Sequence, residues 1–230
     1  MAVSKSIAIC VGRRIACPVF GAALWQGLQV ATMAKAILLS DVISNIESSN
    51  ERKKLLLHCC CAPCASHVLK LIAPYFKITT IYCETNIVPE SEYTKRENQL
   101  RKMLSMEEYR FVKDSVYIEY DRGTYDKISK IPMEKEGGFR CVECFASRLK
   151  EVAFWSVVHE QDYFATTLTV SPHKNAQLIN IIGSEISKVV SADYLVSDFK
   201  KQGGFQRSIE ISKRLGLYRQ SYCGCKPVNS

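Results

Sequence analysis

From about residue 53 to residue 217, hydrophobic and polar positions follow two patterns, one typical of strands and one typical of helices. Short apolar or β-branched runs predict strands at residues 54–58, 77–83, near 110–112, 163–170 and 194–197. Between them, longer segments with helical spacing or dense charge predict helices at residues 65–76, 90–109, 141–161, 174–190 and 205–217. The pattern therefore predicts a chain in which strands and helices follow one another in turn.

Strands that alternate with helices of this length indicate the α/β class. Parallel strands need long crossover connections, and the helices that form these connections cover both faces of a mostly parallel sheet. Ligands of such sheets bind beyond the carboxyl ends of the strands. We therefore expect the functional site among the residues that directly follow predicted strands, which are His58 to Cys61, Ser171 with Pro172, and Ser197 with Asp198.

The first 50 residues differ from the rest, and we expect an N-terminal extension at 1–50 followed by a single α/β catalytic domain at 51–230. No acidic residue precedes Asp41, although several basic residues do. This composition suits an organelle targeting segment, and a start of translation at Met33 is the alternative. No uninterrupted apolar stretch of about 18 residues follows, so no membrane span is predicted. We expect a cytoplasmic protein, with organelle targeting by residues 1–50 as the other possibility.

The net charge of the chain indicates which class of partner it binds. The formal net charge is +8, and residues 197–230 hold seven Lys and Arg against two Asp and Glu. A positive field of this kind favours anionic ligands, of which nucleic acid comes first and an acidic membrane surface second.

Cysteines gather in three tight clusters that long periodic segments separate. Four of them occupy six positions in "HCCCAPC", two form "CVEC", and two form "CGC". A secreted disulfide framework belongs to short, loop-rich chains, so these clusters instead indicate metal or redox sites in a reducing compartment. The first cluster also contains no glycine, which excludes a glycine-rich phosphate cradle at this position.

Two of the clusters have the spacing of metal ligands. Cys61 and Cys64 are three residues apart at the start of a predicted helix, and Cys141 and Cys144 repeat this arrangement. The positive end of a helix lowers the pKa of a thiol and favours the thiolate that binds metal. The two pairs can supply a four-sulfur site for either structural zinc or an iron-sulfur cluster, and a thioredoxin-like role for "CAPC" is a third reading.

The third cluster has a different geometry. Cys223 and Cys225 flank one glycine, and a disulfide between them closes a very small, strained ring that is easily reduced. A redox pair is therefore favoured over a structural crosslink, which gains little from so short a loop. Additional metal ligands are the alternative.

Four ordered blocks resemble the cobalamin-independent epoxyqueuosine reductase family (QueH). They are "LLLHCCCAPCASHVL", "GGFRCVECFASRL", "DYFATTLTVSPHKNAQLIN" and "SDFKKQGGFQRSIEISKRLGLYRQSYCGC", and the match runs from about Lys54 to Cys225. The resemblance implies reduction of the epoxide of epoxyqueuosine in tRNA to give queuosine, the last step of queuosine synthesis. It also implies a Rossmann-like sheet, a 4Fe-4S cluster and an adjacent mononuclear iron, which favours iron-sulfur over zinc.

The resemblance also assigns roles to individual cysteines. It places the cluster ligands at Cys60, Cys61, Cys141 and Cys144, the second iron near Cys64, and the redox-active pair at Cys223 and Cys225. Cys59 stands where we expect a small residue such as serine, so it is given no ligand role.

The expected reaction is a two-electron reductive removal of the epoxide oxygen, with a Lewis-acidic iron at that oxygen and electrons from an unidentified donor. Asp198 is our candidate for the proton donor or for a supporting role. Lys174, Lys200 and Arg219 are our candidates for binding tRNA. The competing hypothesis is a zinc-stabilised RNA-binding module without catalysis.

Overall fold

The computed structural model describes residues 36–84, 86–132 and 137–225. The part of the predicted N-terminal extension and targeting segment that precedes residue 36 lies outside these described residues. Within them, no helix is both long and apolar enough to cross a bilayer.

Five strands form one parallel sheet, as predicted. They are β1 (Lys53–His58), β2 (Phe76–Tyr82), β3 (Asp114–Tyr117), β4 (Tyr163–Thr166) and β5 (Asp193–Tyr194). Their order across the sheet is β3-β2-β1-β4-β5, and every pairing is parallel. This is the order of a Rossmann-like sheet, whose chain reverses its direction of travel between β1 and β4. The predicted α/β class is thereby confirmed.

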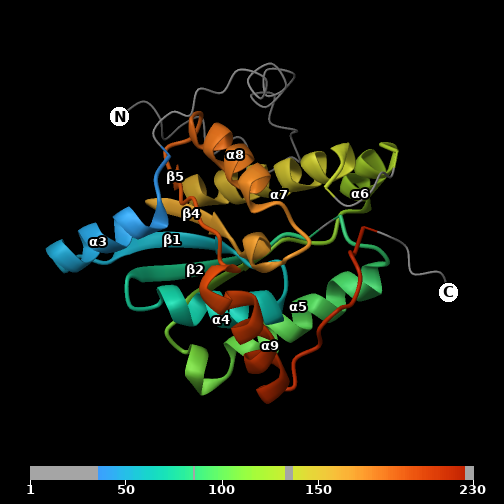
Figure 1. The fold of residues 1–230 in the computed structure, drawn as a ribbon. Helices are drawn as coiled ribbons and strands as arrows, with labels where there is room; N and C mark the ends of the chain where they lie inside the picture. The colour runs from blue at the N-terminus through green and yellow to red at the C-terminus, as the bar shows by residue number, and fades with distance from the viewer. Residues whose placement is uncertain (1–35, 85, 133–136, 226–230) are drawn as a thin grey trace. The chain divides into compact units, whose positions relative to one another are not determined.

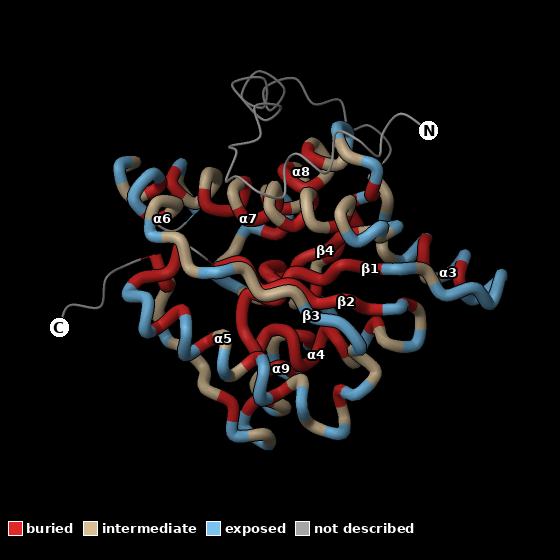
Figure 2. The backbone as a smooth tube through the Cα atoms, turned by 180° about the vertical axis from the view of Figure 1, so that it is seen from behind, coloured by how far each residue is buried: buried red, intermediate tan, exposed pale blue. Residues whose placement is uncertain are grey.

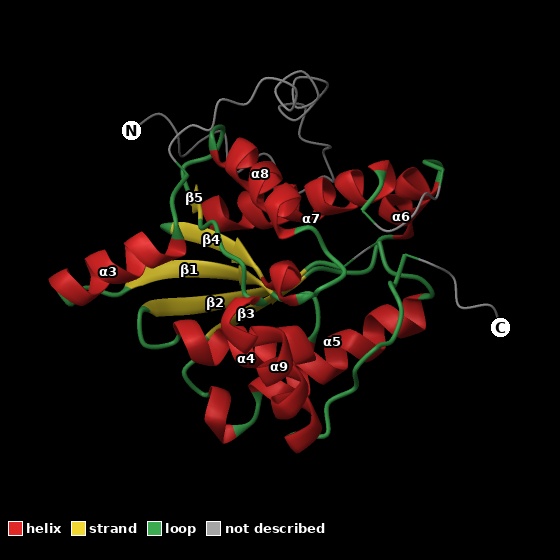
Figure 3. Ribbon diagram, viewed as in Figure 1, coloured by secondary structure: helices red, strands yellow, loops and turns green. Residues whose placement is uncertain are grey.

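Helices cover both faces of this sheet. The α-helices are α3 (Leu39–Ser49), α4 (Ala62–Ile72), α5 (Glu90–Leu104), α6 (Arg122–Ser129), α7 (Phe139–Val158), α8 (Ala176–Ser187) and α9 (Gly204–Arg214). Short 3-10 helices lie at η2 (Glu107–Tyr109), η3 (Thr167–Val170) and η4 (Lys201–Gly203). Figure 1 shows α7 and α8 on one face and α4, α5 and α9 on the other, and Figure 3 shows the strands as the layer between them.

The core follows the central strands. Leu55, Leu56 and Leu57 of β1 are fully buried, because side chains on both faces of a central parallel strand meet a helix layer. Figure 2 shows this buried layer running through β1, β2 and β4. A continuous apolar run, rather than strict alternation, is therefore what the sequence shows at β1.

Several element boundaries differ from the predicted ones. The strand expected near residues 110–112 lies instead at Asp114–Tyr117, after the 3-10 turn η2. The strand expected at 163–170 ends at Thr166, because the Thr166 hydroxyl accepts a hydrogen bond from the Leu168 amide and begins η3. Helix α6, which the sequence pattern did not predict, begins after Asp121, whose carboxylate accepts from the Gly123 amide.

Residues of the predicted N-terminal extension take part in the fold. Helix α3 buries Val42 and Ile46. The segment before it pairs with the edge of the sheet, where the Leu39 amide donates to the Val196 carbonyl (3.1 Å) and the Val196 amide donates to the Ile37 carbonyl (2.9 Å). Leu38 therefore forms an isolated parallel bridge with Val196, which follows β5 by two residues.

Candidate metal and redox site

A cavity at the carboxyl end of the sheet collects cysteines from all three sequence clusters. It is lined by Cys60, which follows β1, by Cys141 and Cys144 of α7, and by Cys223 and Cys225 near the end of the chain. Its volume is about 70 Å³, several times the roughly 10–15 Å³ that one water needs. Thiols that are more than 80 residues apart in sequence thus share one space, and this space lies at the reversal of the sheet where α/β proteins bind ligands.

The first cluster sits at the start of α4. Cys61 is the residue before the first turn, and Pro63 occupies that turn, as the sequence predicted. The sulfur atoms of Cys60, Cys61 and Cys64 all lie within 4.8 Å of one another, and all three residues are buried. Two sulfur ligands of one ion, each about 2.3 Å from it, are at most about 4.6 Å apart. The three thiols are therefore close to the spacing that the sulfur ligands of one ion require.

The ionisation of these three thiols is unequal. Hydrogen bonds from the thiols of Cys60 and Cys64 lower the pKa of Cys61. Hydrogen bonds with Cys60 and Cys61, together with burial, raise the pKa of Cys64. Outside the group, the Thr167 hydroxyl lies 3.4 Å from the Cys60 sulfur and accepts a hydrogen bond from the Cys60 amide (3.1 Å). One thiolate is thus favoured in the group, and metal binding must displace the remaining protons.

The second cluster lies in the first turns of α7. The Cys144 sulfur accepts a hydrogen bond from Asn86 Nδ2 at 2.6 Å, and the Cys141 sulfur lies 3.4 Å from the Gly137 amide. Burial raises the pKa of Cys144 to about 11, and the nearby Arg148 guanidinium opposes this rise. Both sulfur atoms therefore have a hydrogen-bond donor close by, but for Cys144 the effect of burial is larger than that of Arg148 and favours the neutral thiol.

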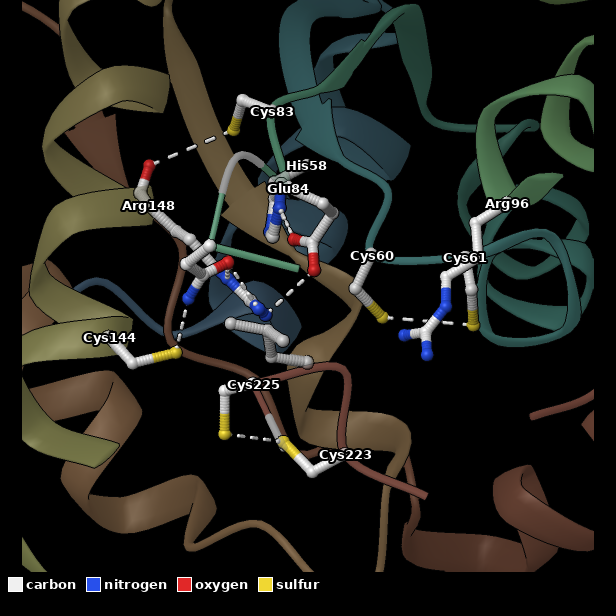
Figure 4. A network of polar contacts seen from close by, with 12 residues as sticks. His58, Cys60, Cys61, Cys83, Glu84, Arg96, Cys144, Arg148, Cys223 and Cys225 are labelled. Atoms are coloured by element: carbon white, nitrogen blue, oxygen red, sulfur yellow. Dashed lines mark hydrogen bonds and ion pairs between the residues drawn. The ribbon is translucent and has the colours of Figure 1, made fainter. Parts of the chain in front are cut away.

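A buried polar network joins the second cluster to the sheet. Glu84 accepts from His58 Nε2 (2.8 Å) and pairs with Arg148 Nη1 (2.9 Å), and Arg148 in turn donates to Asn86 Oδ1. Figure 4 shows His58, Glu84 and Arg148 in the region between Cys144 and Cys60, with Cys223 and Cys225 below them. Sequence reasoning missed Glu84, Asn86 and Arg148. The carboxyl-end rule could have found the first two, since "CETN" directly follows a predicted strand.

The third cluster is docked onto the loop after β2. The sulfur atoms of Cys223 and Cys225 lie 3.3 Å apart as free thiols. The Val88 amide donates to the Gly224 carbonyl (2.8 Å), and a Cβ atom on Gly224 would lie 2.8 Å from a side-chain carbon of Ile87. The glycine is thus required by this close approach. The Cys225 thiol, and then Lys174 and Arg148, lower the pKa of Cys223 to about 5 against the opposing effect of burial.

Positive side chains surround the thiols. Among the residues that the structure describes, Arg96, Arg140, Arg148 and Lys174 line the cavity together with one carboxylate, Glu84. Burial acts to lower the pKa of Lys174, but the neighbouring Cys60, Cys223 and Cys64 outweigh it and raise that pKa. The cavity is therefore suited to a group of net negative charge, such as a metal centre with several thiolate ligands.

Five of the predicted site residues lie outside the cavity lining, and they are Cys61, Cys64, Asp198, Lys200 and Arg219. Asp198 Oδ1 pairs with Lys200 Nζ (2.9 Å), and the Asp198 carbonyl accepts from the Lys201 amide. Arg219 donates to the Ser208 hydroxyl (2.9 Å), and its guanidinium lies over the Phe205 ring. Lys174, which we expected to contact tRNA, is the one basic candidate of the three that lines the cavity.

Cys59 also lies outside the lining. Its thiol is fully buried and points to the Leu57 carbonyl at 3.6 Å. Burial raises its pKa well above the usual range, so it stays a neutral thiol. The absence of a ligand role for Cys59 remains a prediction.

Most of the chain is similar in sequence to known proteins. Residues 55–228 match the model of the family described as "Epoxyqueuosine reductase QueH". A protein of that name from Staphylococcus epidermidis is 39% identical over 193 residues, which cover 82% of this chain and 81% of the relative. Relatives of the same name from Haemophilus influenzae and Thermotoga maritima are 34% and 33% identical, over 78% and 74% of this chain and 73% and 88% of their own length.

Proposed function

The chain belongs to the epoxyqueuosine reductase QueH family, whose members reduce epoxyqueuosine to queuosine in tRNA, and we propose that it performs this reduction in the cavity lined by its cysteines. The reaction takes up two electrons and two protons, breaks both carbon–oxygen bonds of the epoxide, and releases the oxygen as water. The observation that carries the proposal is the meeting of the three cysteine clusters at the reversal of the sheet.

The proposed cofactor is a 4Fe-4S cluster with an adjacent mononuclear iron. Cys60, Cys61, Cys141 and Cys144 are the proposed cluster ligands, and Cys64 is proposed to serve the second iron. The dense group of buried thiols, the amide donor on Cys144 and the basic cavity lining all suit a thiolate-ligated iron centre. When bound, these centres supply single electrons and a Lewis acid for the epoxide oxygen.

Two cavity residues are proposed to act on the substrate oxygen. Lys174 stays protonated because thiols surround it, so its ammonium group stabilises negative charge that develops as the epoxide opens. Arg140 reaches the Cys225 carbonyl through Nη2 (3.4 Å) and adds a second fixed positive charge at the same cavity. Both charges are in place before the substrate arrives, so they need little reorganisation during the reaction.

Cys223 and Cys225 are proposed to pass electrons from an external donor to the site. Cys223 is largely a thiolate near neutral pH because its pKa is lowered to about 5, and its neighbour can form the disulfide. The pair lines the cavity, so electrons need to travel only across it. Oxidation of the two thiols to a disulfide releases the two electrons that one turnover consumes.

Binding of the tRNA is proposed to use Lys200 and Arg219 for phosphates, with Tyr222 at the cavity as a planar surface for an unstacked base. Asp198 is proposed to hold Lys200 through their ion pair rather than to touch the substrate, since it is not part of the cavity lining. This supporting role replaces proton donation as the preferred role for Asp198.

The test is metal and sulfide analysis of anaerobically purified protein, coupled to an assay for loss of the epoxide from tRNA. We expect a brown protein with iron and acid-labile sulfide, and conversion of epoxyqueuosine to queuosine with an added reductant. Cys59→Ser is the matched control for Cys60→Ser, because the two cysteines are adjacent and both buried. A colourless zinc protein that binds tRNA without turnover would favour the RNA-binding module instead.

A further inference from the structure

We propose that Asn86 is a positioning residue that donates a hydrogen bond to the Cys144 sulfur and thereby raises the reduction potential of the metal centre. This inference rests on the proposed function, because it takes Cys144 as a ligand of an iron-sulfur cluster. Its starting point is the contact from Asn86 Nδ2 to the Cys144 sulfur at 2.6 Å, between side chains that are almost completely buried.

The orientation of the Asn86 amide is determined by Arg148. Arg148 Nε and Nη2 both donate to Asn86 Oδ1, at 2.9 and 2.7 Å. A guanidinium has only donors, so the reversed amide would place its NH₂ group against two N–H groups. The amide oxygen must therefore face Arg148, and the NH₂ group must face the sulfur.

Arg148 is held in place by side chains at the carboxyl ends of the strands. Its Nη1 pairs with Glu84 Oε2 at 2.9 Å, and Glu84 Oε1 lies 2.8 Å from His58 Nε2. The other ring nitrogen of His58 meets the Thr166 hydroxyl at 2.8 Å. Hydrogen bonds thus run without a break from the ends of β4 and β1, through the loop after β2, to the helix that holds Cys144.

The members of this network satisfy one another. The Thr166 hydroxyl accepts from the Leu168 amide, so its own hydrogen is available for His58 Nδ1. His58 then donates from Nε2 to the Glu84 carboxylate, which also accepts from Arg148. The Asn86 amide is the last group in this series, and its free N–H groups have the Cys144 sulfur as their partner.

A purely structural role explains this arrangement poorly. Well-packed apolar residues usually stabilise a protein at least as well as a buried ion pair does. What apolar residues cannot supply is a fixed N–H donor at a ligand sulfur. Such donors stabilise the more negative, reduced state of a cluster and so raise its potential. The network therefore has a use that is specific to the proposed metal centre.

Asn86→Asp tests the inference with little change in shape. It replaces the NH₂ donor by a carboxylate oxygen, while the other oxygen can still accept from Arg148, but it also adds a negative charge that lowers the potential by itself, so Asn86→Ala decides whether the donor matters. Asn86→Ala is the second variant, and it removes the whole amide. The control is Asn180→Ala, because Asn180 also has both amide atoms bonded, to the Ser197 carbonyl (2.9 Å) and the Tyr194 hydroxyl (3.0 Å), but neither partner is a cysteine.

The measurement is the midpoint potential of the cluster, obtained by anaerobic redox titration followed by electron paramagnetic resonance, with iron and sulfide content determined on the same samples. We expect Asn86→Asp to keep its iron and to lower the equilibrium constant for reduction about tenfold, a shift of about 59 mV for one electron. Asn86→Ala should shift the potential in the same direction, and Asn180→Ala should leave it unchanged.

The outcomes separate this inference from the proposed function. Wild-type protein without iron and sulfide would remove the premise of both. Wild-type protein with a cluster, combined with an unchanged potential in both Asn86 variants, would overturn the hydrogen-bond role alone. An equal shift in Asn180→Ala would also overturn it, because the effect would then follow from any lost amide rather than from the donor at the sulfur.

Discussion

We expect the stability of the protein to be especially sensitive to loss of the Glu84 carboxylate. It is 1% exposed and lies between His58, which is fully buried, and Arg148, which is 6% exposed. Burial alone acts to lower the pKa of Arg148, but Cys144 and Glu84 outweigh it, so the guanidinium stays charged. Glu84→Gln keeps the side-chain volume and an acceptor for His58, but it removes the negative charge and turns an NH₂ group toward the Arg148 guanidinium, which has only donors.

We expect Glu84→Gln to lower the free energy of unfolding by about 3–5 kcal/mol, because it leaves the Arg148 charge buried without its carboxylate partner. That is a large share of the roughly 5–15 kcal/mol that stabilises a typical domain. Arg148→Met should have a comparable effect, since it leaves Glu84 without a cation. The double variant should lose less than the sum of the two, because it leaves neither charge alone.

The assay is urea unfolding under anaerobic conditions, analysed by linear extrapolation. Variants are compared at equal iron content, because a group that binds only the folded state adds its own stabilisation. The control is Glu97→Gln, which removes a carboxylate from the more exposed pair with Arg101 (2.7 Å) and should cost less than about 1 kcal/mol. A loss at Glu84→Gln no larger than this control, or strict additivity in the double variant, would refute the reasoning.

Four further predictions concern the site. Cys141→Ser and Cys61→Ser should lose most of the cluster iron and all turnover, because serine is a poor ligand for a soft iron-sulfur site. Cys59→Ser should keep both its iron and its turnover. Equal iron loss in all three variants would contradict the ligand assignment. Cys223→Ser and Cys225→Ser should keep their iron and a first turnover but fail in multiple turnover with external reductant, and normal multiple turnover would argue against the relay. Iodoacetamide at pH 6 should label Cys223 before Cys225 in the reduced protein, because the contact between the two thiols lowers the pKa of Cys223 to about 5 and raises the pKa of Cys225. Peptide mass spectrometry detects the order of labelling. Affinity for tRNA should fall about 20-fold between about 50 and 200 mM salt if three phosphates are contacted, and a salt-independent affinity measured by filter binding would exclude those contacts.

The local pattern of the sequence was enough to predict the main elements. Apolar runs of strand length and amphipathic segments of helix length reflect burial, and burial in an α/β protein repeats with the period of each element. The position of "CAPC" and "CVEC" at helix starts also follows from local signals, such as Pro63 in the first turn of α4. Among the elements that were missed or shifted, α3 lies in the segment interpreted as an extension, α6 is a helix of only eight residues, and β3 is a four-residue strand without a buried residue.

The order of the strands, by contrast, is a property of the tertiary structure. Placing β1 between β2 and β4 brings His58 opposite Thr166 and within reach of Glu84, three residues from separate parts of the chain. No spacing along the sequence encodes that meeting. The same holds for Arg148, which follows Cys144 by one helical turn but is given its partners by the loop after β2.

The sequence by itself therefore determined the fold class, the presence of cysteine clusters with the spacing of metal ligands and the edge of the sheet where they lie. Only the tertiary structure decided which charges and donors surround them, because Lys174 and Gly224 reach the cavity, and Asn86 reaches the Cys144 sulfur, through packing between distant segments. The physical reason is that hydrophobic periodicity reflects which face of a local element is buried, and residues close together in sequence are enough to show it. The electrostatics of a buried site depends on groups that become neighbours only when the sheet has formed.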